Sequence, residues 1–340
     1  MEKRIIITAD DFGVVPSIDE GITAAVLAGR VNSVAIFTNH TDPVTRETSI
    51  QRAAALIAKA QAAGKSLDPG VHLTISSGKP LLEASARPEN GMCDRKGNFK
   101  SFTELRNGGI PKEALRNELN EQINVMRRAG IEPKHLSCHH NTLLCFEDLF
   151  EVYVSVAKEQ KLPMRSVVVL PVRRQNLYIK VFMSLKLGED NSSWDIRQMR
   201  LLLRELSIRF QKLSNGEVWI PGYVDSSYYG PIPAFRIFGT FLDKMSRRRE
   251  QRLLRILSRF SDGQDETMEF MVHLRSGKVS LWSRYRKEID ETGYKGIDHK
   301  YFDSRTVEFK SLMNSDFDKL LADKGIVKGG WNVRKVEELV

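Results

Sequence analysis

Short apolar segments alternate with longer helical patterns along most of this chain, and this alternation limits its fold more than any other feature. The first apolar segment covers residues 5–8 (IIIT), whose β-branched side chains favour a strand. A helix is expected to open at Pro16, and Ser17 and Glu20 have the spacing of a capping box. We expect further strands over residues 31–38, 70–75, 135–140, 164–170 and 268–274. We expect further helices over residues 48–63, 113–129, 146–160, 195–213, 233–261 and parts of 305–325.

Strands that alternate with helices predict an α/β protein with a mainly parallel sheet and helices outside it. At 340 residues the chain is long enough either for two domains or for one large α/β barrel. No internal repeat and no low-complexity linker divides the sequence. Residues 76–112 carry Gly, Pro and Asn at short intervals, so a long loop is expected there.

Ionisable side chains stand at or near the ends of four of the expected strands. They are Asp10 with Asp11, His72, His139 with His140, and His273. In parallel α/β folds the carboxyl ends of the strands form the active site. A carboxylate and imidazoles brought there from separate strands suit a divalent metal ion.

Each of these residues also has an ordinary structural interpretation. Adjacent acids after a strand, such as Asp10 and Asp11, are commonly part of a turn or a helix cap. A single strand histidine such as His72 is more often packed in a core than bound to a metal. Neighbours on a strand point to opposite faces, so one of His139 and His140 can face the site. The joint occurrence at four strand ends favours the functional interpretation.

Composition excludes several other classes of protein. Apolar residues make up 41% of the chain and charged residues 28%, which is typical of globular rather than disordered or coiled-coil proteins. No run of about 18 apolar residues is present, and the first apolar run ends at Asp10, too early for a signal peptide. The cysteines, Cys93, Cys138 and Cys145, fit neither a disulfide framework nor a zinc ribbon. We therefore expect a reducing, cytoplasmic location.

The positive charge is concentrated in one segment. Residues 173–259 hold 17 lysine and arginine residues against 8 acidic ones, a net charge of +9 that equals the net charge of the whole chain. A solvated helical face that packs on the rest of the protein is the plainest explanation. Residues 173–187 mix basic and apolar side chains, so a buried helix or a subunit-interface helix in a homo-oligomer and, less favoured, contact with a membrane surface stay open. No nucleic-acid-reading motif is present, so no nucleic-acid partner is expected.

Several motifs together resemble the YdjC-like carbohydrate deacetylase family, and they occur in the family's order. They are TADDFG (8–13), GVHLTISSGKPL (70–81), PKHLSCHH (133–140), LPMR (162–165) and MEFMVH (268–273). The segments GNFKSFTEL (97–105) and RTVEFKSLMNSDFDKLLADKGI (305–326) are similar too. The resemblance covers most of the chain except much of the basic segment, and the combination is specific although no single motif is.

The resemblance implies a fold and a reaction. The fold is a distorted, TIM-like (β/α) barrel, forming a single domain over residues 1–340 with a basic helical elaboration at about residues 173–216. The reaction is metal-dependent removal of an N-acetyl group from an amino sugar or oligosaccharide. The ion is zinc, given two imidazoles, or magnesium, given the family, and the ligand set does not decide between them.

The resemblance also assigns roles to residues that match the family motifs. Asp11, His72 and His139 match the metal ligands, Asp10 the general base, and His273 the histidine acid. These residue types suit amide hydrolysis, because a divalent ion lowers the pKa of a bound water and polarises the acetyl carbonyl. Asp10 can take the proton of the water, and His273 can protonate the leaving amine.

Substrate contacts are expected from a second set of residues. Arg165 matches a recurrent arginine of the family that orients the base or binds substrate, and His140 is expected to contact substrate. The aromatic segment 219–230 (WIPGYVDSSYYG) offers Trp219 and Tyr223, whose rings can stack on sugars. An ordinary barrel loop is an equally weighted interpretation of that segment.

The sequence departs from the family pattern at three places. Ser137 stands where the family commonly has Asp. The family has another histidine near the position that Asn141 occupies here, and it commonly has Pro-Gly where this chain has Leu274–Arg275. None of these departures removes an expected ligand. They change the residues around the ligands and the substrate pocket, which tune ligand orientation, so the substrate can differ from a simple chito-oligosaccharide.

We therefore predict a metal-dependent hydrolase that deacetylates an N-acetylated sugar. Two alternatives stay open. One is a metal-dependent hydrolase of a lipid-linked or other N-acyl substrate. The other is a non-catalytic binding protein on the same fold.

Overall fold

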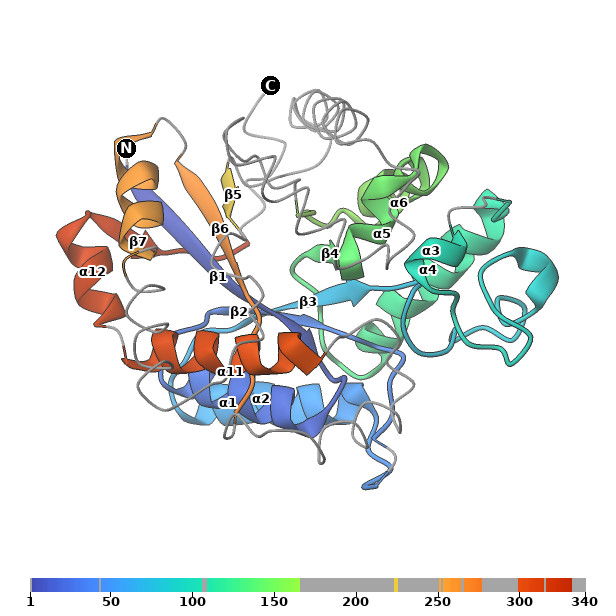
Figure 1. The fold of residues 1–340 in the computed structure, drawn as a ribbon, viewed down its shortest axis with the longest axis horizontal. Helices are drawn as coiled ribbons and strands as arrows, with labels where there is room; N and C mark the ends of the chain where they lie inside the picture. The colour runs from blue at the N-terminus through green and yellow to red at the C-terminus, as the bar shows by residue number, and fades with distance from the viewer. Residues whose placement is uncertain are drawn as a thin grey trace.

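The centre of the molecule is one parallel sheet (Figure 1). The computed structural model describes residues 2–42, 44–105, 109–165, 223–225, 251, 253–263, 266–276, 299–314 and 316–331. Within them the 7-stranded sheet has the order β4-β3-β2-β1-β6-β5, and β7 pairs with the start of β1. The strands are β1 (Lys3–Phe12), β2 (Ser33–Ile36), β3 (Asp68–Leu73), β4 (Leu136–Cys138), β5 (Tyr223–Asp225), β6 (Thr267–Val272) and β7 (Ile326–Lys328).

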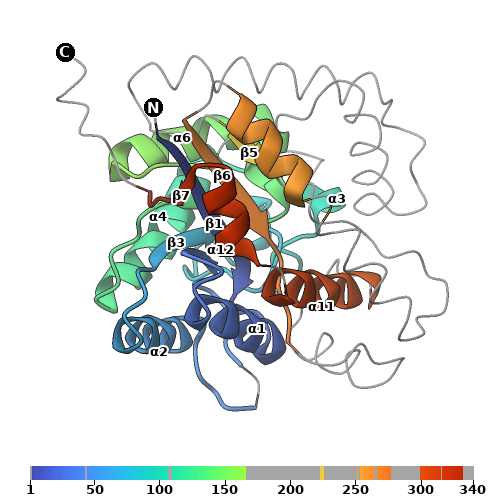
Figure 2. The same cartoon turned by 90° about the vertical axis from the view of Figure 1, so that its left-hand side faces the viewer.

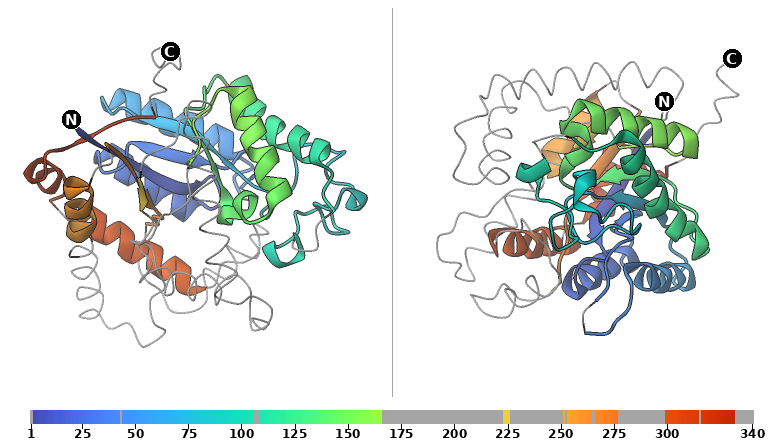
Figure 3. Two further views of the ribbon diagram at one scale, coloured as in Figure 1. Left: turned by 90° about the horizontal axis from the view of Figure 1, so that it is seen from above. Right: turned by 90° about the vertical axis from the view of Figure 1, so that its right-hand side faces the viewer.

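The sheet curls into a half-barrel with helices outside it, as Figures 1 and 2 show from two sides. Helices α1, α2 and α11 lie together along one side, and α4 packs against α6 along another (Figure 3). The helices are α1 (Pro16–Leu27), α2 (Ser49–Ala62), α3 (Phe102–Leu105), α4 (Lys112–Arg128), α5 (Thr142–Cys145), α6 (Glu147–Gln160), α11 (His299–Asn314) and α12 (Phe317–Asp323). The predicted α/β class and distorted (β/α) barrel are confirmed.

The central strand β1 is buried on both of its faces. Ile5, Ile6 and Ile7 have no exposed surface, as expected for a parallel sheet covered on both sides. The strand runs to Phe12, four residues beyond the expected end at residue 8. Its pairing with β2 shifts register between Ala9 and Phe12. This irregularity falls on the two adjacent aspartates, and such bulges re-aim side chains at strand ends.

The helix starts differ from the sequence prediction in one respect. The residue before α1 is Val15, which makes no side-chain cap, and Pro16 takes the first helical position. Proline suits that position because its fixed φ is helical and its missing N–H has no partner there. The predicted capping box at Ser17 is therefore wrong. The Ser17 hydroxyl instead accepts a hydrogen bond from Arg275 Nε at 3.1 Å, and a complete capping box occurs at Thr48, before α2.

Other expected elements are shorter than predicted or fall outside the described residues. The expected loop over 76–112 also holds the 3-10 turn Pro88–Asn90 and α3. The expected strand 164–170 is described only to Arg165, where Met164 bridges to Leu136 of β4. The helix predicted over 195–213 and the basic elaboration at about 173–216 lie outside the described residues, as does most of 233–261, although 253–262 are helical.

Among the described residues, no helix combines the length and apolar character that crossing a membrane requires. The cytoplasmic location and the single domain over residues 1–340 stay predictions. So do the expectations about a homo-oligomer, a membrane surface and nucleic acid.

Candidate active site

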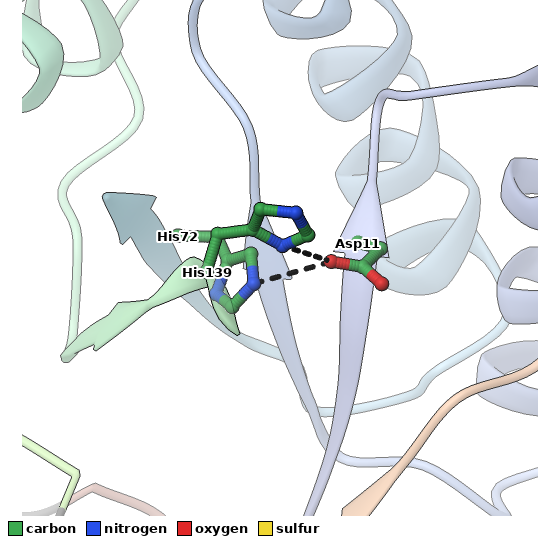
Figure 4. Close-up of side chains that lie close together, drawn as sticks. All are labelled: Asp11, His72 and His139. Carbon is green, nitrogen blue, oxygen red and sulfur yellow. Dashed lines mark hydrogen bonds and ion pairs between the residues drawn. The ribbon is translucent and has the colours of Figure 1, made fainter. Parts of the chain in front are cut away.

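Three buried side chains from separate strands meet at one carboxylate oxygen. His72 Nε2 lies 3.2 Å from Asp11 Oδ1, and His139 Nδ1 lies 3.1 Å from the same oxygen. Figure 4 shows both rings directed at this carboxylate. Each of the three residues is at most 3% exposed. One potential ligand atom from each lies within 4.8 Å of the other two.

Each of the three residues occupies the carboxyl end of a different parallel strand. Asp11 lies in the irregular end of β1 with a φ of 70°, in the left-handed region. His72 is the last but one residue of β3, and His139 directly follows β4. The neighbouring ends of parallel strands bring the three side chains to one edge of the sheet.

The strand expected over residues 135–140 stops at Cys138, so the argument that His139 and His140 alternate across a strand is wrong. Residues His139–Asn141 form a 3-10 turn in which His140 has a φ of 57°. The two rings therefore lie on the same side of the chain and stack with centroids 3.6 Å apart. His139 reaches the Asp11 carboxylate because of this turn, and His140 lies beside it, less deeply buried.

The cluster has the chemistry of a metal site. Burial raises the pKa of Asp11, but the Arg305 guanidinium and the hydrogen bonds from His139 and His72 outweigh burial and hold that pKa well below its usual range. Asp11 is therefore ionised and could serve as an anionic ligand. Two ligand atoms at about 2.1 Å from one ion are roughly 3.0–3.4 Å apart. The distances from Asp11 Oδ1 to His139 Nδ1 and His72 Nε2, 3.1 and 3.2 Å, fall in this range. This buried group could bind a divalent metal ion.

Ser137 sets the orientation of His72. Its Oγ lies 2.7 Å from His72 Nδ1, inside the barrel and without exposure to solvent. A partner on the second ring nitrogen fixes which nitrogen is free to bind a metal. The departure from the family pattern at Ser137 thus puts a hydroxyl, rather than a carboxylate, behind a candidate ligand.

Phe37 packs against the imidazoles of the site. Its ring meets those of His40, His72 and His139 edge to face, with centroids 4.9 to 5.0 Å apart. Burial lowers the pKa of His40 to about 3, with help from His139 and Arg52, so His40 is neutral. His40 Nε2 lies 3.3 Å from Ser77 Oγ. His40 follows the second expected strand, so the strand-end pattern that indicates the other site residues applies to it as well, although it is not among the residues predicted from the sequence.

Asp10 is held by a cation from across the barrel. Arg165 donates from Nη1 and Nη2 to the two Asp10 oxygens at 2.6 and 2.8 Å. Its Nε and Nη2 also donate to Glu269 of β6, at 2.7 to 3.0 Å. Burial raises the pKa of Asp10, yet Arg165 and His72 outweigh it, so the pKa of Asp10 is lowered. Arg165 therefore bridges the predicted base and a second, fully buried carboxylate.

His273 follows β6 and faces the predicted base. Its Nε2 lies 3.9 Å from Asp10 Oδ2, and its backbone N–H donates to Glu308 Oε1 at 2.9 Å. Burial and the Arg305 charge lower the pKa of His273 to about 3 despite both aspartates. The ring is therefore neutral at neutral pH.

Arg305 completes the surroundings of Asp11. From α11 it donates through Nη2 to Asp11 Oδ2 at 2.5 Å, and both side chains are 2 to 3% exposed. Asp11 thus presents Oδ1 to the two histidines, as Figure 4 shows, and Oδ2 to Arg305. Neither Arg305 nor Glu269 was selected from the sequence. A visible signal existed for Glu269, which interrupts the apolar strand MEFMV, but none distinguished Arg305 from other helix arginines.

The structure brings most of the predicted site residues together. The clustered residues are Asp10, Asp11, His72, His139, His140, Arg165 and His273. Trp219 lies outside the described residues, and only the backbone of Tyr223, in β5, is described. The expectation that these two aromatic residues face substrate stays a prediction.

Comparison with known proteins gives a family and a fold. A family model described as YdjC-like protein matches residues 4–323. A crystal structure of an Enterococcus faecalis protein, described provisionally as a cellobiose-phosphate cleavage protein, superposes with a TM-score of 0.64 at 19% identity over 100% of both chains. At that identity the likeness concerns the fold alone.

Curated relatives match about half of the chain. A carbohydrate deacetylase of Clostridium beijerinckii is 29% identical over 164 residues, which are 48% of this chain and 60% of the relative. A chitooligosaccharide deacetylase of Escherichia fergusonii is 29% identical over 166 residues, again 48% of this chain and 60% of the relative. The matched part of the chain therefore spans about 60% of the length of these relatives.

Proposed function

Because this chain belongs to the YdjC-like protein family, we propose that it is a metal-dependent hydrolase that removes the N-acetyl group of an amino sugar or oligosaccharide. The relatives named as carbohydrate and chitooligosaccharide deacetylases support the substrate class. One observation carries the proposal. The buried group of Asp11, His72 and His139, which could bind a metal ion, lies directly beside Asp10, a carboxylate held ionised by Arg165.

In this proposal Asp11, His72 and His139 hold a divalent ion, either zinc or magnesium. The chemistry that such an ion supplies when bound is activation of a water molecule and polarisation of the amide carbonyl. A set of three protein ligands would leave room for water and substrate. Ser137 keeps the His72 ring oriented, and Arg305 keeps Asp11 Oδ1 turned toward the histidines.

Asp10 serves as the general base. Arg165 contacts both of its oxygens, which fixes the plane of the carboxylate. Glu269 shares the same guanidinium, so Arg165 is braced from both sides. A base must have both the right position and the right protonation state, and these contacts supply both for Asp10.

His273 delivers a proton to the leaving amine. Because its buried ring is neutral, it must first accept a proton before it can donate one. Asp10 Oδ2 lies 3.9 Å from His273 Nε2, beyond hydrogen-bond distance, so in this proposal the proton taken from water passes between them through one water molecule or after the two side chains approach. Asp10 and His273 thus form a relay that ends with both groups in their starting states. His140, Trp219 and Tyr223 remain our candidates for contacts to the sugar.

The test is acetate release from a panel of N-acetylated sugars by metal-stripped protein, before and after addition of zinc or magnesium. We expect release only with restored metal. His72→Ala and His139→Ala should lose metal and release together, whereas Asp10→Ala should lose release and keep the metal. Unchanged release by Asp10→Ala would refute its role as base. A tightly bound metal without release from any sugar would refute the substrate class, and no metal and no release would refute the hydrolase.

A further inference from the structure

The turn between β1 and α1 has unusual backbone geometry next to a candidate metal ligand. Asp11 has a φ of 70° and Gly13 a φ of 96°. Residues with side chains seldom adopt such angles, and they persist where the surroundings over-determine them. At Gly13 an added Cβ would lie 2.5 Å from the Cβ of Ser49. The direction of the Asp11 carboxylate therefore depends on what holds this turn.

Two side chains hold both main-chain polar groups of Gly13. Asp19, in α1, accepts the Gly13 N–H through Oδ1 at 2.6 Å, and its Oδ2 accepts from Arg52 Nε at 2.7 Å. Arg52, in α2, donates from Nη2 to the Gly13 carbonyl at 2.6 Å and from Nη1 to the Glu47 carbonyl at 2.8 Å. We call this arrangement the Asp19–Arg52 clamp. It connects α1 and α2 to one residue, Gly13, in the turn that follows β1.

The clamp is buried. The side chain of Asp19 is 9% exposed and that of Arg52 is 11% exposed. A buried ion pair is weak evidence for stability, because the cost of removing two charges from water can exceed their attraction. Both hydrogen bonds described for the Asp19 side chain go to Gly13 or to Arg52. The two side chains thus contact the backbone of Gly13, two residues after Asp11.

We propose that Asp19 and Arg52 are positioning residues, which fix the turn at Gly13 and so aim Asp11 at His72 and His139. This inference rests on the proposed metal site. Hydrogen-bonded partners behind metal ligands typically change metal affinity by 10–100-fold when they are lost. The clamp contacts the backbone near Asp11 and not a ligand side chain itself. We therefore expect its loss to lower metal affinity about tenfold, the lower end of that range.

The experiment measures zinc affinity of the full chain by competition with a chromophoric chelator. We expect about tenfold weaker binding for Asp19→Asn and Arg52→Met. Arg52→Lys keeps the charge but cannot reach all the acceptors of the guanidinium, so partial rescue is expected. Arg30→Met is the matched control, because it breaks the ion pair of Arg30 with Asp318 at 3.1 Å, away from the turn. Its zinc affinity should equal that of the wild type.

A second measurement reads the turn directly. Amide hydrogen exchange of the segment 10–15 in the metal-free protein should be faster in the clamp variants and unchanged in the Arg30 control. Folded clamp variants that bind zinc as tightly as the wild type would overturn the inference. If Asp19→Asn does not fold, Arg52→Lys decides the same question. A wild type that binds zinc but releases no acetate would refute the proposed function alone, and one that binds neither zinc nor magnesium would overturn both.

Discussion

Replacing Asp19 by asparagine removes a buried carboxyl group whose ionisation opposes folding. Burial raises the pKa of Asp19 from its ordinary value of 3.8 to about 6, against the opposing effects of Arg52 and the Gly13 N–H. The folded protein therefore binds this proton more tightly than the unfolded chain does. The resulting stabilisation is fully present below about pH 4 and is lost as the pH rises through about 6.

The size of the effect follows from the difference in pKa. Each unit corresponds to about 1.4 kcal/mol, so a rise from 3.8 to about 6 is worth about 3 kcal/mol. The free energy of unfolding of the wild type, minus that of Asp19→Asn, should fall by most of this amount, about 2 kcal/mol, between pH 4 and pH 7, because the remainder is lost below pH 4. Groups that titrate alike in both proteins cancel in the difference.

The assay is urea unfolding of both metal-free proteins at half-unit steps from pH 4 to pH 7.5. Arg52→Met provides a second test of the same assay, because Arg52 lowers the pKa of Asp19 while Asp42 raises it. Without the arginine, the pH-dependent loss of unfolding free energy should occur at higher pH and should be larger. A stability difference that stays constant over this range would refute the reasoning, as would a step in the opposite direction.

Three further substitutions test other contacts of the site and the barrel. Ser137→Ala removes the hydroxyl at 2.7 Å from His72 Nδ1, so zinc affinity measured by chelator competition should fall about 10-fold or more. Glu269→Gln removes one of the two carboxylates that brace Arg165, so kcat for acetate release should fall about tenfold with zinc affinity unchanged. Equal kcat would contradict that role. Gly70→Ala would place a Cβ 2.2 Å from a ring atom of a fully buried histidine, so thermal unfolding should show a loss of roughly 1–3 kcal/mol.

The class of fold and the candidate ligands could be predicted because both depend on local patterns. A strand such as β1 is recognisable from consecutive isoleucines, and α2 from its helical periodicity. Parallel strands place their carboxyl ends on one edge, so the ionisable residues at four strand ends could be expected to meet, and the family resemblance then singled out Asp11, His72 and His139 among them as ligands. The predicted cap at Ser17 failed because a neighbouring proline competes for the same helix start.

The partners that hold those ligands were decided by the tertiary structure. Arg305 is 294 residues from Asp11 along the chain, and Arg165 is 104 residues from Glu269. Local sequence determines whether a segment is a strand or a helix and which of its faces is apolar. It does not determine which distant charge shares a buried pocket, because that depends on how the sheet curls and how the helices pack on it. The sequence alone thus predicts the residues that can bind a metal, and the packing of the barrel decides how each of them is oriented and charged.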